Sequence, residues 1–406
     1  MEWKEVRLES ILALPSRNGL TKPSKIRGKG VKMIGMGELF ANPIIYDIPM
    51  DRVPVTDKEL SNSRIMPGDL LFARQSLTLE GAGKCCYVKE VKEETVFESH
   101  LIRIRIDNTK ADAEFIYYFF NSFIGKCLIQ NLVTQVAAAG IRGSELVKLD
   151  ITIPKEVEDQ RRIASILSSL DRKIELNNKI NADLEEMAQA IFKNWFVDFE
   201  PFKDGNFVDS ELGMIPEGWK VGTLKDLLYL RKDSIKAANK GNLPYLPIDT
   251  IPMHCLVATD FKSNDEAKSS LQTFEQNDIV VGAMRVYFHR VILAPCKGIT
   301  RTTCFVLSVK NENALAYSLM QCNQDEAISF AEKTSKGSTM PYAVWDGGYG
   351  EYKVVIPPSE VMKSFNDLLS NFFSKMNKNA IENSRLSLLR DTLLPRLMSG
   401  ELEVPE

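Results

Sequence analysis

The sequence repeats itself, because three short patterns of its first half recur in the same order in its second half. The recurring pairs are Trp3-Lys4 with Trp219-Lys220, residues 67–72 with 276–281, and residues 149–154 with 352–357. The separation between the copies falls from 216 to 209 to 203 residues. The two halves therefore share one architecture and differ by short insertions and deletions.

A long segment with helical periodicity follows each copy of the Ile-Pro pattern. The segments run from about 158 to 196 and from about 361 to 398, with large apolar residues three or four positions apart. No Gly or Pro interrupts either segment before Pro395. Each predicts a helix of roughly 55 Å, at about 1.5 Å per residue.

One position per heptad gives a predicted core for this helix pair, with an asparagine in the middle of each series. The series are Ile163, Leu170, Asn177, Leu184 and Ile191, and Phe365, Phe372, Asn379, Leu386 and Leu393. In an antiparallel pair, contacting residue numbers would sum to about 556, so that Asn177 bonds to Asn379, amide to amide. The alternative is that both asparagines lie on a solvated edge.

The remainder of each half alternates between strand-like and helical patterns, which predicts α/β (α+β) modules. Strands are expected at 69–73, 101–106, 148–153, 278–281, 303–309 and 353–356, and shorter helices at 113–132 and 314–331. The expected parts are a module at 1–157, a helix at 158–197, a linker at 198–217, a second module at 218–358, a helix at 359–399 and a tail at 400–406.

Composition places the chain among ordinary globular proteins, with 44% apolar residues, 26% charged residues and a net charge of −3. No apolar run approaches the ~20 residues that cross a bilayer, and no signal peptide is recognisable. The seven cysteines form no CxxC pair. We therefore expect a cytoplasmic protein with reduced thiols and no membrane association.

Catalytic signatures are missing from the sequence. The three histidines, at 100, 254 and 289, have no metal-ligand spacing, and there is neither a phosphate-binding loop nor a G-x-S-x-G elbow. Asn42-Pro43 continues into Ile44, without the aromatic residue of an adenine methyltransferase motif. We expect no catalytic residue and no metal site.

Basic and hydrogen-bonding residues gather on three predicted loops of the first module. The first loop, residues 16–32, contains no acidic residue, and its glycines mark it as a loop. Arginine and glutamine suit bidentate contacts with guanine and adenine, and lysine suits phosphates. The candidate DNA-binding residues are Arg17, Lys22, Lys25, Arg27, Lys29 and Lys32, then Arg74, Gln75, Ser76 and Lys84, then Gln135, Arg142 and Ser144.

The second module places different residues at the same points of the repeat. They are Arg231, Lys232 and Lys236, then Arg285, Tyr287, His289 and Arg290, then Lys336, Tyr342 and Trp345. Two readers of different DNA half-sites would show this pattern, and so would a divergent structural repeat.

Three motifs carry a resemblance to a known family. The segments 193–202 (KNWFVDFEPF) and 212–219 (LGMIPEGW) resemble the central region of the specificity subunits of type I restriction-modification systems. Residues 394–402 (LPRLMSGEL) resemble the C-terminal signature of that family, and residues 160–164 (QRRIA) the start of its helices. The second helix departs from the family pattern, since it opens with Val361-Met362-Lys363.

The resemblance implies two target-recognition domains on an antiparallel helix pair, each reading half of a split target in double-stranded DNA. Two methyltransferase subunits and the restriction subunits would be its partners. S-adenosylmethionine, ATP and Mg²⁺ would belong to those partners, so that this chain is a recognition subunit and not an enzyme. A rigid helix pair would set the half-site spacing, on the order of one turn of DNA, ~34–36 Å. The alternative is a non-catalytic protein-binding scaffold with a coiled-coil spacer.

Overall fold

The computed structural model describes residues 1–135, 139–258 and 261–404 of the chain, which folds into two compact units. The first unit comprises Met1–Asp171 and Leu388–Glu406, and the second comprises Arg172–Ser387. Both long helices contribute to both units. Among the described residues, no helix is long and apolar enough to cross a membrane.

The first unit is built around a five-stranded sheet in the order β2-β10-β6-β8-β4. Its strands are β2 (Leu12–Asn18), β10 (Leu101–Ile106), β6 (Asp69–Ala73), β8 (Cys85–Val88) and β4 (Ile44–Ile45). Smaller sheets are formed by β1 (Trp3–Arg7) with β13 (Asp150–Pro154), by β5 (Asp51–Val53), β3 (Val31–Ile34) and β9 (Thr95–Phe97), and by β11 (Thr134–Gln135), β12 (Ala139–Gly140) and β7 (Gln75–Ser76). Its helices include α1 (Met36–Ala41), α2 (Asp57–Ser63), α3 (Ala113–Asn121), α4 (Phe123–Gln130) and α5 (Gly143–Leu146).

The second unit repeats this plan with a four-stranded sheet in the order β17-β23-β20-β21. Its strands are β17 (Leu228–Leu230), β23 (Cys304–Val309), β20 (Ile279–Gly282) and β21 (Val291–Leu293). Further pairs are β14 (Phe207–Ser210) with β15 (Gly213–Pro216) and β16 (Lys220–Thr223) with β24 (Lys353–Ile356), and β18 (Ser234–Ile235), β19 (Leu271–Phe274) and β22 (Gly298–Arg301) form a third sheet. Its helices include α7 (Leu224–Leu227), α8 (Leu315–Cys322) and α9 (Asp325–Lys333).

The structure confirms the internal repeat, since the echoed segments occupy equivalent places. Lys4 pairs with Ile153 between β1 and β13, and Lys220 pairs with Ile356 between β16 and β24. The central strands β6 and β20 correspond as well. Asp69, the first residue of β6, accepts from the backbone of Met66, three residues earlier, at 2.8 Å. Asp278 before β20 accepts from the backbone of Glu275 at 2.7 Å.

The shorter helices differ from the prediction, because each expected single helix is broken into two. In the first unit α3 ends at Asn121, and Ser122 caps α4 by accepting from the backbone of Gly125 at 3.2 Å. A Cβ at Gly125 would lie 2.1 Å from the carbonyl oxygen of Phe119, so the sharp turn depends on this glycine. In the second unit Asn323 and Gln324 separate α8 from α9. Apolar periodicity continued through both breaks and concealed them.

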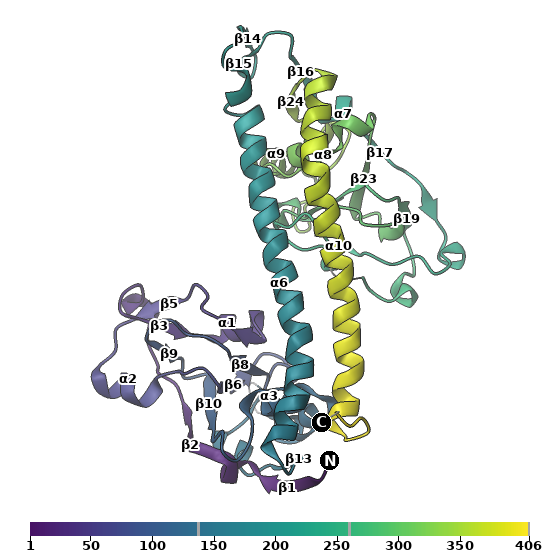
Figure 1. Cartoon of the computed structure of the whole chain (residues 1–406). Helices are drawn as coiled ribbons and strands as arrows, with labels where there is room; N and C mark the ends of the chain where they lie inside the picture. The colour runs from purple at the N-terminus through teal and green to yellow at the C-terminus, as the bar shows by residue number, and fades with distance from the viewer. Residues whose placement is uncertain (136–138, 259–260, 405–406) are drawn as a thin grey trace. The chain divides into compact units, whose positions relative to one another are not determined.

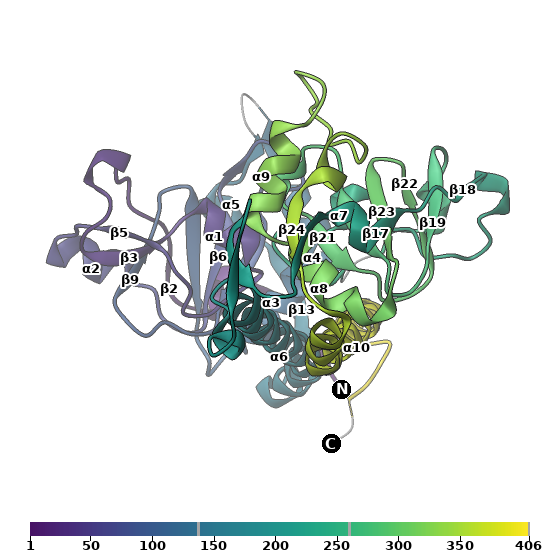
Figure 2. The ribbon, with the colours of Figure 1, turned by 90° about the horizontal axis from the view of Figure 1, so that it is seen from above.

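The two long helices are α6 (Val157–Phe196) and α10 (Ser359–Met398), each of 40 residues. Figure 1 shows them side by side, and Figure 2 shows the pair from above. They are antiparallel within each unit, as predicted: Arg390 bonds Asp171 at 2.7 Å in the first unit, and Asn383 bonds Asn177 at 2.9 Å in the second. The predicted linker contains 3-10 turn η3 (Glu200–Phe202) and the β14–β15 hairpin.

Both central asparagines are buried, but the predicted register is wrong by one helical turn. Asn177 is 0% exposed and donates to Asn383 Oδ1, while Asn379 is 1% exposed and donates to Asn181 Oδ1 at 2.8 Å. The contacting numbers sum to 560 and not 556, and Asn177 and Asn379 do not bond each other. The reason is that each helix carries two asparagines four residues apart, so four amides share the layer and pair crosswise.

The predicted helix-pair core is only partly buried. Ile163 and Phe365 are fully buried, whereas the other apolar members are partly exposed: Leu170, Leu184, Ile191, Phe372, Leu386 and Leu393. Fully buried neighbours that the heptad series omits include Leu167 and Leu369. The buried stripe follows the helix period of about 3.6 residues and faces the modules as well as the partner helix, so it drifts away from one heptad position.

Candidate nucleic-acid interface

Three segments that are distant in the sequence meet at one face of the first unit. They are the end of β2, the connection between β6 and β7, and the start of α5. Together they line one shallow pocket, whose residues are Ser16, Arg17, Asn18, Arg74, Arg142, Gly143 and Ser144. None of these seven residues is acidic, so three guanidinium groups face the same space without a carboxylate among them. Such a surface attracts phosphates and base-edge acceptors.

Backbone pairing holds this junction together. Residues of β7 pair with β12, which pairs in turn with β11, and the backbone of Ile141 donates to the carbonyl of Arg74 at 2.9 Å. Arg142 follows directly and is exposed at the start of α5. Arg74 donates to the carbonyl of Ser99 at 3.3 Å, and Arg17 donates to Asn62 Oδ1 at 2.6 Å. These two arginines are thus positioned by neutral acceptors, both oxygens of Asn62 for Arg17 and the carbonyl of Ser99 for Arg74.

The basic loop at 16–32 is less open than its sequence indicates, because carboxylates from other segments approach it. Lys22 binds Glu59 at 2.9 Å, with 11% of the lysine side chain exposed. Lys32 binds Asp47 at 2.7 Å and Glu93 at 3.1 Å, with 12% exposed, and hydrogen bonding to Asp47 raises its pKa. Carboxylates pair with both lysines, which leaves them less open to phosphates than the sequence indicates, and their DNA-facing role stays a prediction.

The other cations of this loop remain at the surface. Arg27 pairs with Asp51 at 3.0 Å, and one third of its side chain is exposed. Lys25 and Lys29 are exposed, and no carboxylate of the described residues pairs with them. The loop therefore offers two free ammonium groups and one partly neutralised guanidinium.

The β7–β8 connection presents a different surface from the one predicted. Gln75 is exposed and Ser76 partly so, but Lys84 donates to the carbonyl of Phe40 at 2.9 Å and lies over its ring. Leu77, which the predictions did not single out, is fully exposed in this connection. The side chain of Gln135 lies outside what the structure describes.

The second unit forms the same junction with other side chains. Tyr342 forms bridges with Met284 and with Lys336, as β12 does with β7 and β11 in the first unit. Tyr342 is 47% exposed and Lys336 is exposed. Trp345 is only 6% exposed and packs on Tyr349, so the prediction that it contacts DNA is wrong. Its aromatic neighbours come from β23 and a later turn, and the sequence does not show that they converge.

The remaining candidates of the second unit divide into surface and structural residues. Lys232, Lys236, Arg285 and Tyr287 are exposed. Three others are engaged inside the unit. Arg231 pairs with Asp278 and Asp233, Arg290 bonds the carbonyl of Ile248 and lies over Phe288, and His289 is 5% exposed. The burial of His289 contradicts its predicted contact with DNA, whereas the DNA-binding role of Arg231 and Arg290 stays a prediction.

Comparison with known proteins gives this surface a context. Residues 1–186 match the family model for the type I restriction modification DNA specificity domain. The chain is 29% identical over 308 residues to the type I restriction enzyme MjaIX specificity subunit of Methanocaldococcus jannaschii, covering 72% of this chain and 70% of that one. It is 24% identical over 486 residues to the HindI specificity subunit of Haemophilus influenzae, covering 99% and 100%.

The fold has a counterpart among solved structures. The S subunit of a type I restriction-modification system from M. genitalium aligns with 98% of this chain and 96% of its own, with a TM-score of 0.58 and 15% identity. At that identity the likeness concerns the fold alone.

Proposed function

We propose that the chain is a specificity subunit of a type I restriction-modification system, the DNA-recognition component of those enzymes, and that its two modules read the two halves of a split target in double-stranded DNA. We place the first target-recognition domain at residues 1–157 and the second at 218–358. The observation that carries the proposal is the meeting of Arg17, Arg74 and Arg142 in one pocket without an acidic neighbour.

The contacts divide by chemistry. We propose that Arg74, Arg142 and Gln75 read base edges, because their planar groups donate two hydrogen bonds in one plane. Lys25 and Lys29 would bind phosphates and set the register on the duplex. In the second module, Arg285, Tyr287, Lys336 and Tyr342 would take the corresponding places, with Lys232 and Lys236 on phosphates.

The assembly follows from the family. We propose that two methyltransferase subunits dock on α6 and α10, and that restriction subunits join this complex to cleave DNA. S-adenosylmethionine, ATP and Mg²⁺ would serve the partner subunits. The recognition subunit would then hold the target DNA in place while the partner subunits methylate its adenines or cleave it.

Duplex binding as a function of salt tests this function. A DNA reader releases counterions when it neutralises phosphates, so the logarithm of its affinity falls linearly with the logarithm of salt concentration, by about 0.9 per phosphate contact. We expect the purified chain, alone or with its methyltransferase subunits, to lose affinity steeply between low and physiological salt. Affinity that is absent or independent of salt would contradict the proposal and favour a protein-binding scaffold.

A further inference from the structure

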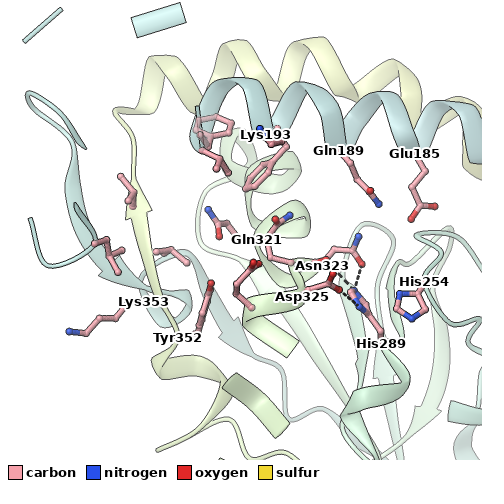
Figure 3. Close-up of a pocket in the computed structure, with 18 residues that line it drawn as sticks. Glu185, Gln189, Lys193, His254, His289, Gln321, Asn323, Asp325, Tyr352 and Lys353 are labelled. Carbon is pink, nitrogen blue, oxygen red and sulfur yellow. Dashed lines mark hydrogen bonds and ion pairs between the residues drawn. The ribbon is translucent and has the colours of Figure 1, made fainter. Parts of the chain in front are cut away.

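Two of the three histidines meet in the second unit beside an aspartate. His254 lies in the loop after the 3-10 turn η5 (Ile248–Thr250), His289 follows η7 (Val286–Phe288), and Asp325 is the first residue of α9. One ring nitrogen of each histidine and one carboxylate oxygen lie within 4.8 Å of one another. Figure 3 shows the three side chains converging. The sequence spacing of the histidines gave no sign of this cluster, because three separate segments bring it together.

The surroundings of His289 define the state of its ring. Its Nε2 lies 3.1 Å from the backbone oxygen of Asn323 and 3.0 Å from Oδ1 of the same residue. Both partners accept hydrogen bonds, so Nε2 carries the proton. Its Nδ1 lies 3.1 Å from Asp325 Oδ1, which also accepts. The His289 side chain is 6% exposed and the Asp325 side chain 85% exposed, so this contact opens to solvent on the side of Asp325, where a metal ion could reach both ligand atoms.

The donor set and its spacing suit a transition metal. Two ligand atoms bound at about 2.0–2.1 Å to a tetrahedral zinc ion lie roughly 3.3 Å apart, close to the observed 3.1 Å. Histidines that bind metals usually donate their other N–H to a carbonyl or carboxylate, as His289 does to Asn323. His254 is exposed and its ring centroid lies 4.5 Å from that of His289, so its side chain can adjust to an ion.

We infer that His254, His289 and Asp325 bind one divalent transition-metal ion of the zinc type, with water completing the coordination. The ion would join three segments of the second module. The loop of His254 is already held on α6, because the backbone of Leu256 donates to Glu185 Oε2 at 3.1 Å. Tyr287 is two residues before His289, so the ion would also steady a loop that presents an exposed aromatic side chain. The inference does not depend on DNA recognition.

Calorimetric titration of the metal-stripped full chain with Zn²⁺ tests the site. We expect one ion per chain and a higher thermal unfolding temperature when Zn²⁺ is present. His254→Ala and Asp325→Asn should each weaken Zn²⁺ binding by tenfold or more and abolish the thermal shift. His254 is exposed, so His254→Ala should unfold at the same temperature as the natural chain when no metal is present, whereas Asp325→Asn also loses the contact with His289.

Two controls separate this site from the rest of the chain. His100→Ala removes the one histidine outside the cluster, and Cys255→Ser removes the thiol next to His254; both should bind Zn²⁺ as the natural chain does. Absence of Zn²⁺ binding at submillimolar concentration would overturn the inference, and ¹⁵N NMR showing protons on both ring nitrogens of His289 would then identify an imidazolium ion pair. Unchanged binding by His254→Ala and Asp325→Asn would overturn it too.

Discussion

The two modules share a scaffold but differ in the chemistry of their corresponding surfaces. In both, a central strand is flanked by antiparallel neighbours, and a terminal strand pair precedes the long helix. At the junction of loops, however, the first module presents Arg17, Arg74 and Arg142, whereas the second presents Met284, Lys336 and Tyr342. Substitution of a buried sheet residue usually lowers the free energy of unfolding, whereas substitution of an exposed loop residue changes it little. The comparison teaches that one fold can present two chemically different surfaces at corresponding loops.

Removal of the arginine pair should have the largest effect on recognition. Arg74→Ala with Arg142→Ala is expected to weaken specific binding by about 100-fold or more, since each good bidentate contact contributes ~1–3 kcal/mol. The loss should concern base preference in one half of the target only. Competition binding against duplexes changed in either half measures this. Lys148→Ala, which removes an exposed cation outside the pocket, serves as the control. An equal loss of affinity for duplexes changed in either half of the target would mean that the two modules do not read separate halves.

The asparagine layer tests the symmetry of the two repeats. Asn181 and Asn383 occupy equivalent places, and each bonds the central asparagine of the other helix. Substitution of either by Ala should lower the free energy of unfolding by about 1–3 kcal/mol, because buried amide partners lose their hydrogen bonds. Urea unfolding measures the cost, and Lys378→Ala on the exposed face should stay within ~0.5 kcal/mol. A large cost at one position and none at the other would show that the layer is not symmetric.

The basic loop of the first module allows a sharper test, since its lysines divide into two kinds. Lys25→Ala with Lys29→Ala should reduce the salt slope of duplex binding by about two, because each phosphate contact contributes ~0.9. Lys32→Ala should leave the slope unchanged and lower stability, since Lys32 holds Asp47 and Glu93 inside the fold. Duplex titrations at several salt concentrations distinguish the two. If Lys32→Ala changes the salt slope as much as the double substitution of Lys25 and Lys29 does, the division of these lysines into phosphate-binding and structural residues is wrong.

Tyr342 in the second module should show the smallest effect. Tyr342→Ala is expected to weaken binding by roughly 1 kcal/mol, because one exposed aromatic ring contributes a single apolar or stacking contact. The loss should appear only for changes in the second half of the target. Tyr342→Phe keeps the ring and should bind nearly as the natural chain does. A change in preference for the first half would mean that the modules do not read independently.

Much of the scaffold was predictable because it depends on local patterns. The bounds of β6, β10 and β24 match the expected strands, since short apolar runs between polar residues mark buried strands. The long helices were evident from forty residues without a breaking Gly or Pro. The breaks after α3 and α8 were not, because they depend on capping bonds that apolar periodicity does not reveal: the Ser122 hydroxyl donates to the carbonyl of Phe119, and the backbone of Asn323 closes α8.

The candidate site was predictable in kind but not residue by residue. Arg17, Arg74 and Arg142 do meet, because β2 and β6 both pair with β10 and the backbone of Ile141 donates to the carbonyl of Arg74. Lys22 and Lys32 sit in the same basic loop but bind Glu59 and Asp47, whose approach depends on tertiary structure. The helix register failed for a related reason, since two asparagines four residues apart offer two alternative pairings. In each case the missing information was a partner distant in the sequence.

Exchange of one module tests the central claim most directly. Residues 1–150 would be replaced by those of a relative, and the chimera would be expressed with its methyltransferase subunits in a host that lacks the original chain. Sequencing of methylated bases then reports both halves of the target. The account predicts a motif changed in one half and retained in the other. A motif changed in both halves, with the chimera folded and active, would contradict it.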